Sequence, residues 1–269
     1  MHSKLSKAFS DGQETLVVST ALRAIVEAKN SVTLAPSFVQ AFGEIFINRQ
    51  RQTVNSHNDA HEALMCMFVW LQEEKDPFDK VLRLTATSTT RCDKCTTQSS
   101  RQEEMCVMML AIPKDLRQHD LTTIQAVYNR DLEGRTLPNY VCLECKSRQP
   151  AVVKVTYGSN PSGLLVLYLS RHYWYTRTSR IRKHSQQVQS PTITYAGTDY
   201  VLVAVACHKN NHYFAYVARW ENKHCSNIFY RVDDETVVNM ECDRGPTEMW
   251  TYGYLLFYAQ KSFFDLKMK

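Results

Sequence analysis

Long hydrophobic runs are missing from this 269-residue chain, which has no segment of about 18 consecutive apolar residues that would predict a membrane-spanning helix. The first residues, MHSKLSKAFSDG, lack the apolar core of a secretory signal. Internal repeats, low-complexity segments and Gly/Ser linkers are also missing, which removes the simplest grounds for dividing the chain into independent domains. We therefore expect a soluble intracellular protein, cytoplasmic or nuclear, with no membrane partner.

Charge of one sign is not concentrated along most of the chain. The 32 Lys and Arg residues and the 27 Asp and Glu residues are interspersed, and the net charge is +5. Phosphate binding needs a concentrated basic stripe, so we expect no nucleic-acid partner. One basic cluster, RTSRIRKH at residues 177–184, is either a nuclear localisation signal or a solvated basic loop, and we favour the loop.

Hydrophobic residues make up 44% of the chain, which is enough for a sizeable core. In the N-terminal part these residues recur with helical spacing, which predicts helices at 14–28, 36–46 and 58–74. From about residue 79 onward the pattern has mostly period two and is rich in Val, Thr and Tyr. It predicts strands at 151–157, 163–170, 200–207, 212–220, 227–232 and 252–261, with one helix near 121–134. Helices followed by a strand-rich body predict an α+β fold.

Two acidic residues stand side by side on the third predicted helix. Its core stripe consists of Ala60, Leu64, Met67, Phe68 and Leu71. A different face carries Asp59, Glu62, Cys66 and Val69. Two carboxylates one turn apart can hold a cation or a guanidinium group together. The simpler interpretation is that Asp59 caps the helix with Asn58 and that Glu62 lies on a solvated face.

Four of the nine cysteines form two C-x-x-C pairs, Cys92 with Cys95 and Cys142 with Cys145. Two such pairs supply four thiolates, the ligand set of a tetrahedral structural zinc with no open coordination position. Because 46 residues separate the pairs, we expect two hairpin knuckles that the fold brings together. Unconnected thiols or a thioredoxin-like redox motif are the alternatives, but redox motifs occur singly at a βα junction. We predict one zinc per chain.

A histidine at the start of a predicted strand is a candidate base. In HKNNHYFAYVARW a tight turn separates His208 from His212. Taken alone, His212 can equally be a hydrogen-bonded strand histidine, or one ligand of a metal pair with His208.

Six segments in a fixed order resemble the ubiquitin-specific proteases, over about residues 16 to 260. These are NDAHEALMCMFVWL, the paired C-x-x-C knuckles, GLLVLYLSRHYW with the later Lys183, HKNNHYFAYVARW, FYRVDDETVV and YGYLLFY. The resemblance implies a papain-like cysteine protease fold in a single domain, 1–269. It implies a partial helical thumb at 1–78, zinc-ribbon fingers with adjoining strands at 79–160 and a β-rich palm at 161–269. Members of the family hydrolyse the isopeptide bond after the C-terminal glycine of ubiquitin, so ubiquitin or a ubiquitinated protein is the implied partner.

The resemblance also implies roles for four residues. His212 takes the place of the general base, and Asp233 that of the residue that orients its ring, with Asp234 as the second choice. A carboxylate on the far ring nitrogen fixes the tautomer and stabilises the imidazolium. Asp59 and Glu62 match the acidic residues that receive the arginines of the ubiquitin tail.

The nucleophile of the family is missing from its expected place. Family members carry it in a G-N-T-C-Y box near the N-terminus, whereas no cysteine here precedes Cys66. Either segment 13–25 is a decayed box with Leu16 in the place of the nucleophile, or the sequence starts beyond the box, which its spacing favours.

No other cysteine is expected to replace the nucleophile. Cys66 is expected to be a packed thiol, since a free cysteine behaves as a small hydrophobe. Nothing in the sequence places the remaining candidates at a helix N-terminus, where a thiolate would be stabilised. These candidates are Cys106, Cys207, Cys225 and Cys242.

Two further departures from the family pattern concern single positions. His172 replaces the phenylalanine usual after Arg171, which alters the groove for the ubiquitin tail. Asn211 stands where glycine is preferred, a mild change because asparagine tolerates left-handed backbone. The sequence thus predicts a ubiquitin-binding domain without isopeptidase activity. The alternatives are an active deubiquitinase whose cysteine box lies outside this sequence, and a zinc-stabilised interaction scaffold.

Overall fold

The computed structural model describes residues 59–73, 83–113, 122–158, 163–175, 180–183, 187–221, 224–234, 236–241 and 245–262. The predicted helices at 14–28 and 36–46 and the two alternative positions of the cysteine box lie outside these residues. The chain forms two compact units, Met1–Val81 and Leu82–Lys269. None of the helices in the described ranges is both long enough and apolar enough to cross a membrane.

In the first unit, helix α4 (Ala60–Glu73) confirms the third predicted helix. Asp59 begins it: its Oδ1 accepts a hydrogen bond from the His61 backbone N–H at 2.7 Å, and its carbonyl accepts one from Ala63 N–H at 3.0 Å. Cys66 and Phe68 are buried. The prediction that Cys66 is a packed thiol is therefore confirmed, since a free cysteine packs as readily as a small apolar side chain.

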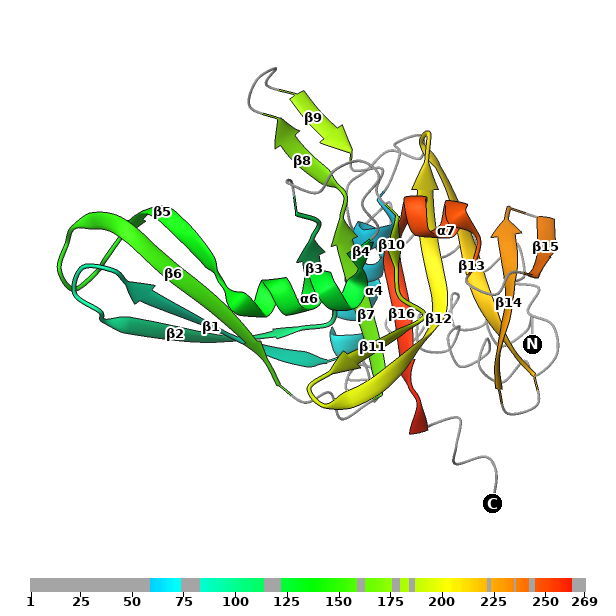
Figure 1. Cartoon of the computed structure of the whole chain (residues 1–269), viewed down its shortest axis with the longest axis horizontal. Helices are drawn as coiled ribbons and strands as arrows, with labels where there is room; N and C mark the ends of the chain where they lie inside the picture. The colour runs from blue at the N-terminus through cyan, green and yellow to red at the C-terminus, as the bar shows by residue number, and fades with distance from the viewer. Residues whose placement is uncertain are drawn as a thin grey trace, which may run out of the picture. The chain divides into compact units, whose positions relative to one another are not determined.

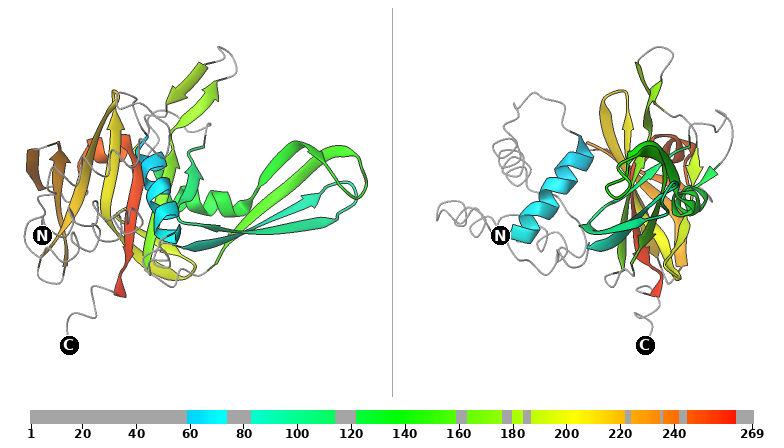
Figure 2. Two further views of the ribbon diagram at one scale, coloured as in Figure 1. Left: turned by 180° about the vertical axis from the view of Figure 1, so that it is seen from behind. Right: turned by 90° about the vertical axis from the view of Figure 1, so that its left-hand side faces the viewer.

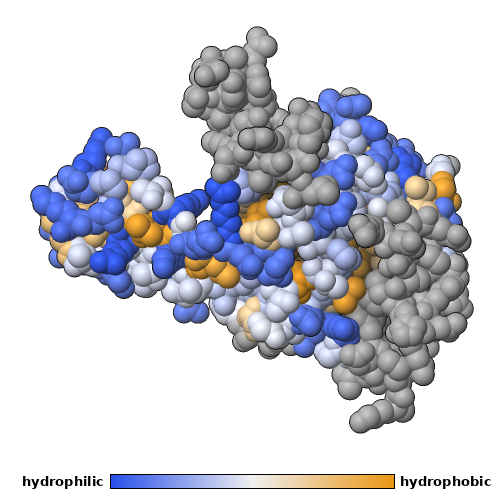
Figure 3. Space-filling model, viewed as in Figure 1, coloured by the Kyte–Doolittle hydropathy of each residue, from blue (hydrophilic) through white to orange (hydrophobic). Residues whose placement is uncertain are grey.

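In the second unit, four strands form a separate antiparallel sheet in the order β2-β1-β6-β5 (Figure 1). Its strands are β1 (Leu84–Cys92), β2 (Gln98–Met105), β5 (Arg135–Val141) and β6 (Arg148–Tyr157). Strands β1 and β2 form one hairpin, β5 and β6 form another, and β1 pairs with β6 between them. Hydrophilic residues cover most of the face of this sheet seen in Figure 3, and every residue of β2 up to Glu104 is exposed.

The larger sheet has eight strands. Its path is β15-β14-β13-β12-β16-β7-β3, and β11 pairs with β12. All pairs are antiparallel except β3 with β7. The strands are β3 (Met108–Ala111), β7 (Leu164–Ser170), β11 (Thr192–Tyr195), β12 (Thr198–Lys209), β13 (His212–Glu221), β14 (His224–Asp233), β15 (Thr236–Glu241) and β16 (Gly253–Gln260). Each of the six predicted strands falls on β6 or on a strand of this sheet, which confirms them.

Two short strand pairs complete the β structure. Strand β4 (Thr122–Thr123) pairs in parallel with β10 (Val188–Gln189), and β8 (His172–Tyr175) pairs with β9 (Arg180–Lys183). The basic cluster at 177–184 was expected to be a loop, but four of its residues form β9, because β8 supplies backbone hydrogen-bond partners.

Two helices pack against one face of the eight-stranded sheet. Helix α6 (Ile124–Glu133) was predicted, and the Thr123 hydroxyl caps it by accepting a hydrogen bond from Ala126 N–H at 3.0 Å. Helix α7 (Thr247–Tyr252) was not predicted. Six residues are too few for a periodic pattern, and the helix exists because its Met249 and Trp250 are buried in the core. The same core cluster contains residues of both helices and of the sheet, among them Val127, Tyr128, Val205, Cys207 and Leu256.

Three tyrosines join the four-stranded sheet to the larger one through α6, which lies between the two sheets in the left view of Figure 2. The Tyr128 ring lies 5.9 Å from the rings of both Tyr157 on β6 and Tyr195 on β11. The Tyr157 hydroxyl donates to Asp131 Oδ2 at 2.8 Å, and the Tyr195 hydroxyl donates to the Gly158 carbonyl at 2.6 Å. The base of the smaller sheet is therefore fixed by hydrogen bonds as well as by apolar contact.

Candidate functional site

The two C-x-x-C pairs occupy the tips of the two hairpins of the four-stranded sheet. Cys92 ends β1 and Cys142 directly follows β5. Since Cys92 on β1 pairs with Ala151 on β6, the β1–β2 turn and the β5–β6 turn lie at the same end of the sheet. The prediction of two hairpin knuckles brought together by the fold is confirmed.

The two tips have the same local conformation. Cys92 N–H donates to the Thr97 carbonyl at 3.0 Å, and Cys142 N–H donates to the Ser147 carbonyl at 3.1 Å. The residue after each second cysteine has left-handed backbone, with φ of 58° at Thr96 and 54° at Lys146. In each pair the first cysteine is buried and the second is half-buried. This repetition is the arrangement expected of two metal knuckles that face one ion.

The four sulfur atoms fit a zinc ion. All four lie within 4.8 Å of one another, with Cys92 Sγ 4.0 Å from Cys145 Sγ and Cys95 Sγ 3.5 Å from Cys142 Sγ. A regular tetrahedron with zinc–sulfur bonds of about 2.3 Å has edges of about 3.8 Å, between these two values. All four cysteines are free thiols, so the thiols are not consumed in disulfides. The cluster can bind one structural zinc and leaves no thiol over for catalysis.

Hydrogen bonds favour the thiolate form of two of the four cysteines, Cys95 and Cys145. At Cys142 the backbone hydrogen bond of Cys145 lowers the pKa, but burial and the contact with Cys95 outweigh it and raise the pKa to about 11. The hydrogen bonds between Cys95 and the side chain and backbone of Thr97 lower the pKa of Cys95 to about 6, and those between Cys145 and Ser147 lower the pKa of Cys145. A zinc ligand must be deprotonated, so these contacts prepare the site for the metal.

The turn between β12 and β13 presents His212. Asn210 and Asn211 have φ of 51° and 62°, the positive values that a two-residue type I′ hairpin requires. The prediction that asparagine would accept left-handed backbone at Asn211 is confirmed. His212 is the first residue of β13 and pairs with Lys209 across the turn.

His212 and Asp233 meet on one face of the large sheet. Ala215 pairs with Val232, and side chains alternate along each strand, so His212 and Asp233 project from the opposite face to that pair. His212 Nε2 lies 2.5 Å from Asp233 Oδ1. The His212 side chain is 48% exposed and the Asp233 side chain 21%. Asp233 therefore fixes one ring nitrogen and leaves Nδ1 to exchange a proton with another group.

The contact between His212 and Asp233 shifts their two pKa values in opposite directions. The hydrogen bond to Asp233 raises the pKa of His212, and the hydrogen bond to His212 lowers the pKa of Asp233. The protonated imidazole is thus favoured by its carboxylate partner. This is the electrostatic arrangement of a base that must carry a proton during a reaction.

A second group of charges adjoins this pair, which sequence reasoning missed. Arg231 Nη1 lies 2.7 Å from Asp233 Oδ2, and Arg231 Nε lies 3.5 Å from Glu248 Oε2 on α7. Glu248 also receives Lys209 Nζ at 2.8 Å and the Tyr216 hydroxyl at 3.0 Å. No sequence pattern predicted a role for Glu248, since the helix that carries it, α7, was not predicted.

The structure also describes the other residues singled out in the sequence, which are Asp59, Glu62, His208 and Asp234. Asp59 caps α4 and Glu62 is exposed in its first turn, as the simpler interpretation expected. His208 stacks on Tyr213 with ring centroids 4.4 Å apart. Asp234, with φ of 50°, completes a group with His212 and Asp233 whose ligand atoms lie within 4.8 Å, and His208 is not in that group.

Among the described residues of the second unit, no cysteine outside the four-thiol cluster is seen in contact with the candidate base. Cys66 and Cys207 are buried, and the Cys207 thiol faces the Met249 carbonyl at 3.8 Å. Cys106, which directly follows β2, is half-buried. The side chain of Cys225 and the whole of Cys242 lie outside what the structure describes. Within the described ranges, the contacts of the His212 ring are those with Asp233 and with the Phe214 ring, 6.5 Å away.

Comparison with known proteins places these features in a family. The profile of the family described as ubiquitin carboxyl-terminal hydrolase matches residues 2–258. A chain of the SAGA DUB module Ubp8/Sgf11/Sus1/Sgf73 bound to monoubiquitin has a similar fold, with a TM-score of 0.67 and 21% identity. A chain of the same module bound to ubiquitin aldehyde gives a TM-score of 0.66 and 20% identity. No curated protein matches the chain in sequence.

The similarity covers most of this chain but only part of the solved chains. It includes 91% of this chain, and 58% and 59% of the two solved chains. The fold predicted from the sequence, that of a ubiquitin-specific protease, is confirmed.

Proposed function

The chain belongs to the ubiquitin carboxyl-terminal hydrolase family, and from this premise we propose that it binds ubiquitin and that residues 1–269 alone do not cleave the isopeptide bond. Similar solved chains come from assemblies with bound monoubiquitin or ubiquitin aldehyde, which supports ubiquitin as the ligand. The proposed lack of isopeptide cleavage rests on one observation: no cysteine precedes Cys66 in the sequence, and the described contacts of the His212 ring include no thiol.

The proposed binding uses two separate parts of the chain. The zinc-bound four-stranded sheet holds the body of ubiquitin, and Asp59 with Glu62 receives the arginines of its tail. His61 N–H occupies Asp59 Oδ1, so the acceptors for a guanidinium are Asp59 Oδ2 and the exposed carboxylate of Glu62. Zinc, when bound, makes the sheet rigid, and the side chains of the sheet make the contacts.

The proposed site contains a base and the residue that orients it, but no nucleophile. Asp233 holds His212 Nε2, so Nδ1 is the atom that would accept a proton from a thiol. Without that thiol no acyl-enzyme forms, since the covalent intermediate needs a nucleophile and not only a base.

Ubiquitin titration tests the binding half. We expect saturable binding that weakens at least about tenfold in the double variant Asp59→Asn, Glu62→Gln, because charge-assisted pairs to arginine are lost. Glu73→Gln, at the other end of the same helix α4, is the matched control and should leave the affinity unchanged. No binding at high micromolar ubiquitin would instead favour the zinc-stabilised scaffold.

A ubiquitin probe with a C-terminal electrophile tests the catalytic half. We expect no labelled cysteine, and strong labelling of any one would refute inactivity. One observation favours a second candidate function: His212 and Asp233 keep the hydrogen bond that a working base needs. This candidate is an active deubiquitinase whose nucleophile lies in residues outside this sequence. Reading the nucleotide sequence upstream of Met1 for a G-N-T-C box distinguishes the two.

We also propose that the protein resides in the cytoplasm or nucleus. Zinc-binding thiolates need a reducing compartment, and seven described cysteines are free thiols. Fractionation of cells that express a tagged chain would test this, and recovery from the secreted fraction would contradict it.

A further inference from the structure

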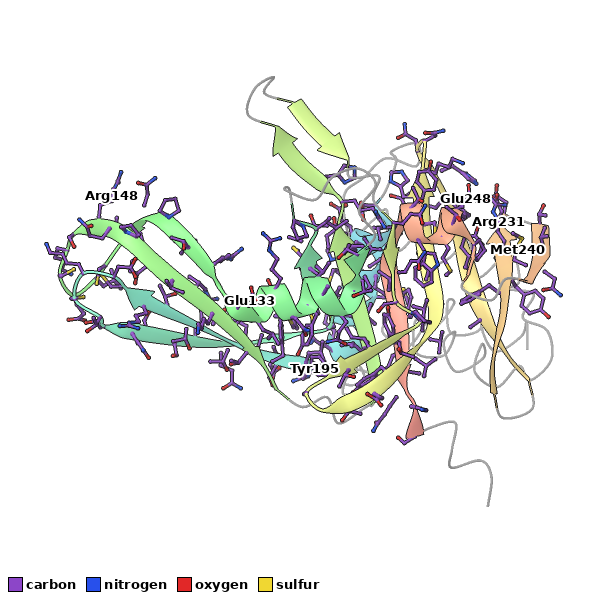
Figure 4. The ribbon with its side chains drawn as sticks, viewed as in Figure 1. Glu133, Arg148, Tyr195, Arg231, Met240 and Glu248 are labelled. Carbon is purple, nitrogen blue, oxygen red and sulfur yellow. The ribbon has the colours of Figure 1, made fainter. Side chains whose placement is uncertain are left out.

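Glu248, in the first turn of α7, collects three donors from three strands of the large sheet. Its Oε1 accepts from Lys209 Nζ on β12 at 2.8 Å. Its Oε2 accepts from the Tyr216 hydroxyl on β13 at 3.0 Å and lies 3.5 Å from Arg231 Nε on β14. Figure 4 shows Glu248 and Arg231 facing each other between α7 and β14. We call these four residues the Glu248 cluster.

Arg231 connects the Glu248 cluster to the His212–Asp233 pair. Its Nη1 lies 2.7 Å from Asp233 Oδ2, while Oδ1 of the same carboxylate faces His212. The guanidinium also lies 4.6 Å from the centre of the Phe214 ring. Each oxygen of Asp233 thus has its own partner, and the carboxylate cannot rotate without losing one of them.

The position of Glu248 is fixed by the burial of α7. Met249 and Trp250 are 0% and 2% exposed. Arg171, itself 2% exposed, donates from Nε to the Gly253 carbonyl and from Nη2 to the Trp250 carbonyl, both at 2.6 Å. A cation at the last carbonyls of a helix compensates its C-terminal dipole. Glu248 therefore stands on an element that the core holds in place.

We propose that Glu248 is a positioning residue for His212: it anchors Arg231, and Arg231 in turn holds the Asp233 carboxylate so that Oδ1 stays on His212 Nε2. The proposal rests on the proposed function only in giving His212 a chemical role. The physical coupling from α7 to the imidazole stands on the contacts alone. It accounts for a carboxylate that gathers three donors beside the site without touching His212 or Asp233.

The charges around His212 give the sign of the expected effect. Asp233 and Asp234 favour its protonated form, and Arg231 disfavours it. Changing Glu248 to Gln removes the negative charge that neutralises Arg231 and Lys209, and it releases Arg231 from its anchor. With Arg231 released, Asp233 Oδ1 is held less firmly on His212 Nε2, and this hydrogen bond is the largest cause of the raised pKa. The weaker hydrogen bond and the uncompensated positive charge both disfavour the imidazolium, so the pKa of His212 should fall.

The test is a pH titration of the His212 ring by NMR in the full chain with zinc bound and without ubiquitin. For Glu248→Gln we expect the pKa of His212 to fall by about half a unit, the size of a modest ion-pair effect. At pH values above that pKa, the ring nitrogen shifts should show a loss of the tautomer with the proton on Nε2. Glu133→Gln on α6 is the matched control and should change neither readout.

A second pair of variants tests whether the effect passes through Arg231. If it does, Glu248→Gln should shift the His212 pKa less in an Arg231→Gln background than in the natural chain. An equal shift in both backgrounds would overturn the relay, as would a change below about 0.1 unit in a folded Glu248→Gln protein.

If Glu248→Gln does not fold, Glu248→Asp supplies the same test. It keeps the charge but shortens the reach to Arg231, so the tautomer preference should weaken, and an unchanged preference would contradict the proposal. These titrations need neither ubiquitin nor a nucleophile. Failure of ubiquitin binding therefore leaves the inference intact, and failure of the inference leaves ubiquitin binding intact.

Discussion

Removal of zinc should unfold the tips of the four-stranded sheet while the rest of the protein stays folded. Apart from the ligands Cys92 and Cys142, the buried side chains towards the tips are Ala151 and Val153. Burying these two contributes roughly 2–4 kcal/mol. The tips Cys92–Thr97 and Cys142–Ser147 contain twelve residues, whose ordering costs on the order of 12–24 kcal/mol at 1–2 kcal/mol each. A structural zinc supplies about 10–16 kcal/mol, which closes the gap.

Hydrogen exchange with and without a chelator measures this effect. The amides of Cys92 and Cys142, bonded across their turns at 3.0 and 3.1 Å, should exchange at least about 1000-fold faster once zinc is removed, since about 4 kcal/mol already gives that factor. Amides of Val205 and Leu256, in the core of the large sheet, should keep their protection.

Two outcomes would refute the reasoning. One is a protein purified without chelator that contains no zinc. The other is a chelated, zinc-free protein whose tip amides exchange as slowly as before. Cys142→Ser should reproduce the effect of the chelator, and Cys106→Ser is its matched control because Cys106 lies outside the cluster.

Three further predictions concern single contacts. Tyr157→Phe removes the hydrogen bond to Asp131 and should lower the free energy of unfolding by about 1–2 kcal/mol in urea denaturation. Lys146→Gly relieves the left-handed backbone at φ of 54° and should raise the unfolding free energy of the zinc-bound protein by about 0.5–1 kcal/mol. The pKa of His212 should lie above its ordinary 6.5 and should fall towards it in Asp233→Asn, as followed by NMR. The stability that this pair contributes is present between about pH 4 and pH 6.5. It is lost as pH rises through the raised pKa of His212 or falls through the lowered pKa of Asp233.

Matched variants serve as controls for these three. Tyr140→Phe should change stability less than Tyr157→Phe, and an equal loss would mean that the hydrogen bond to Asp131 is not the cause. Lys94→Gly adds glycine to a tip where φ is not positive and should destabilise, so stabilisation by both glycines would contradict the backbone argument. Asp234→Asn should lower the His212 pKa less than Asp233→Asn, since Asp233 makes the direct hydrogen bond.

Six of the strands and two of the described helices could be predicted because each repeats a local pattern. The apolar alternation along β12 and β16 and the apolar spacing along α4 and α6 are visible in the sequence alone. Strand β2 could not be predicted in this way, since nearly all its residues are exposed and polar. Its pairing with β1 makes it a strand. Helix α7 likewise has no pattern of its own, and the burial of Trp250 makes it a helix.

The sequence by itself determined the identities that the chemistry needs: four cysteines in two close pairs, a histidine after an Asn-Asn turn and an aspartate after a β-rich segment. Residue type and short spacing are local properties, so they can be read without coordinates. Only the tertiary structure decided that sulfur atoms 47 and 53 positions apart in sequence lie 3.5 and 4.0 Å from one another, and that Glu248 stands beside Arg231. Those contacts depend on strand register and on a helix held by the core, and both arise from packing between distant segments.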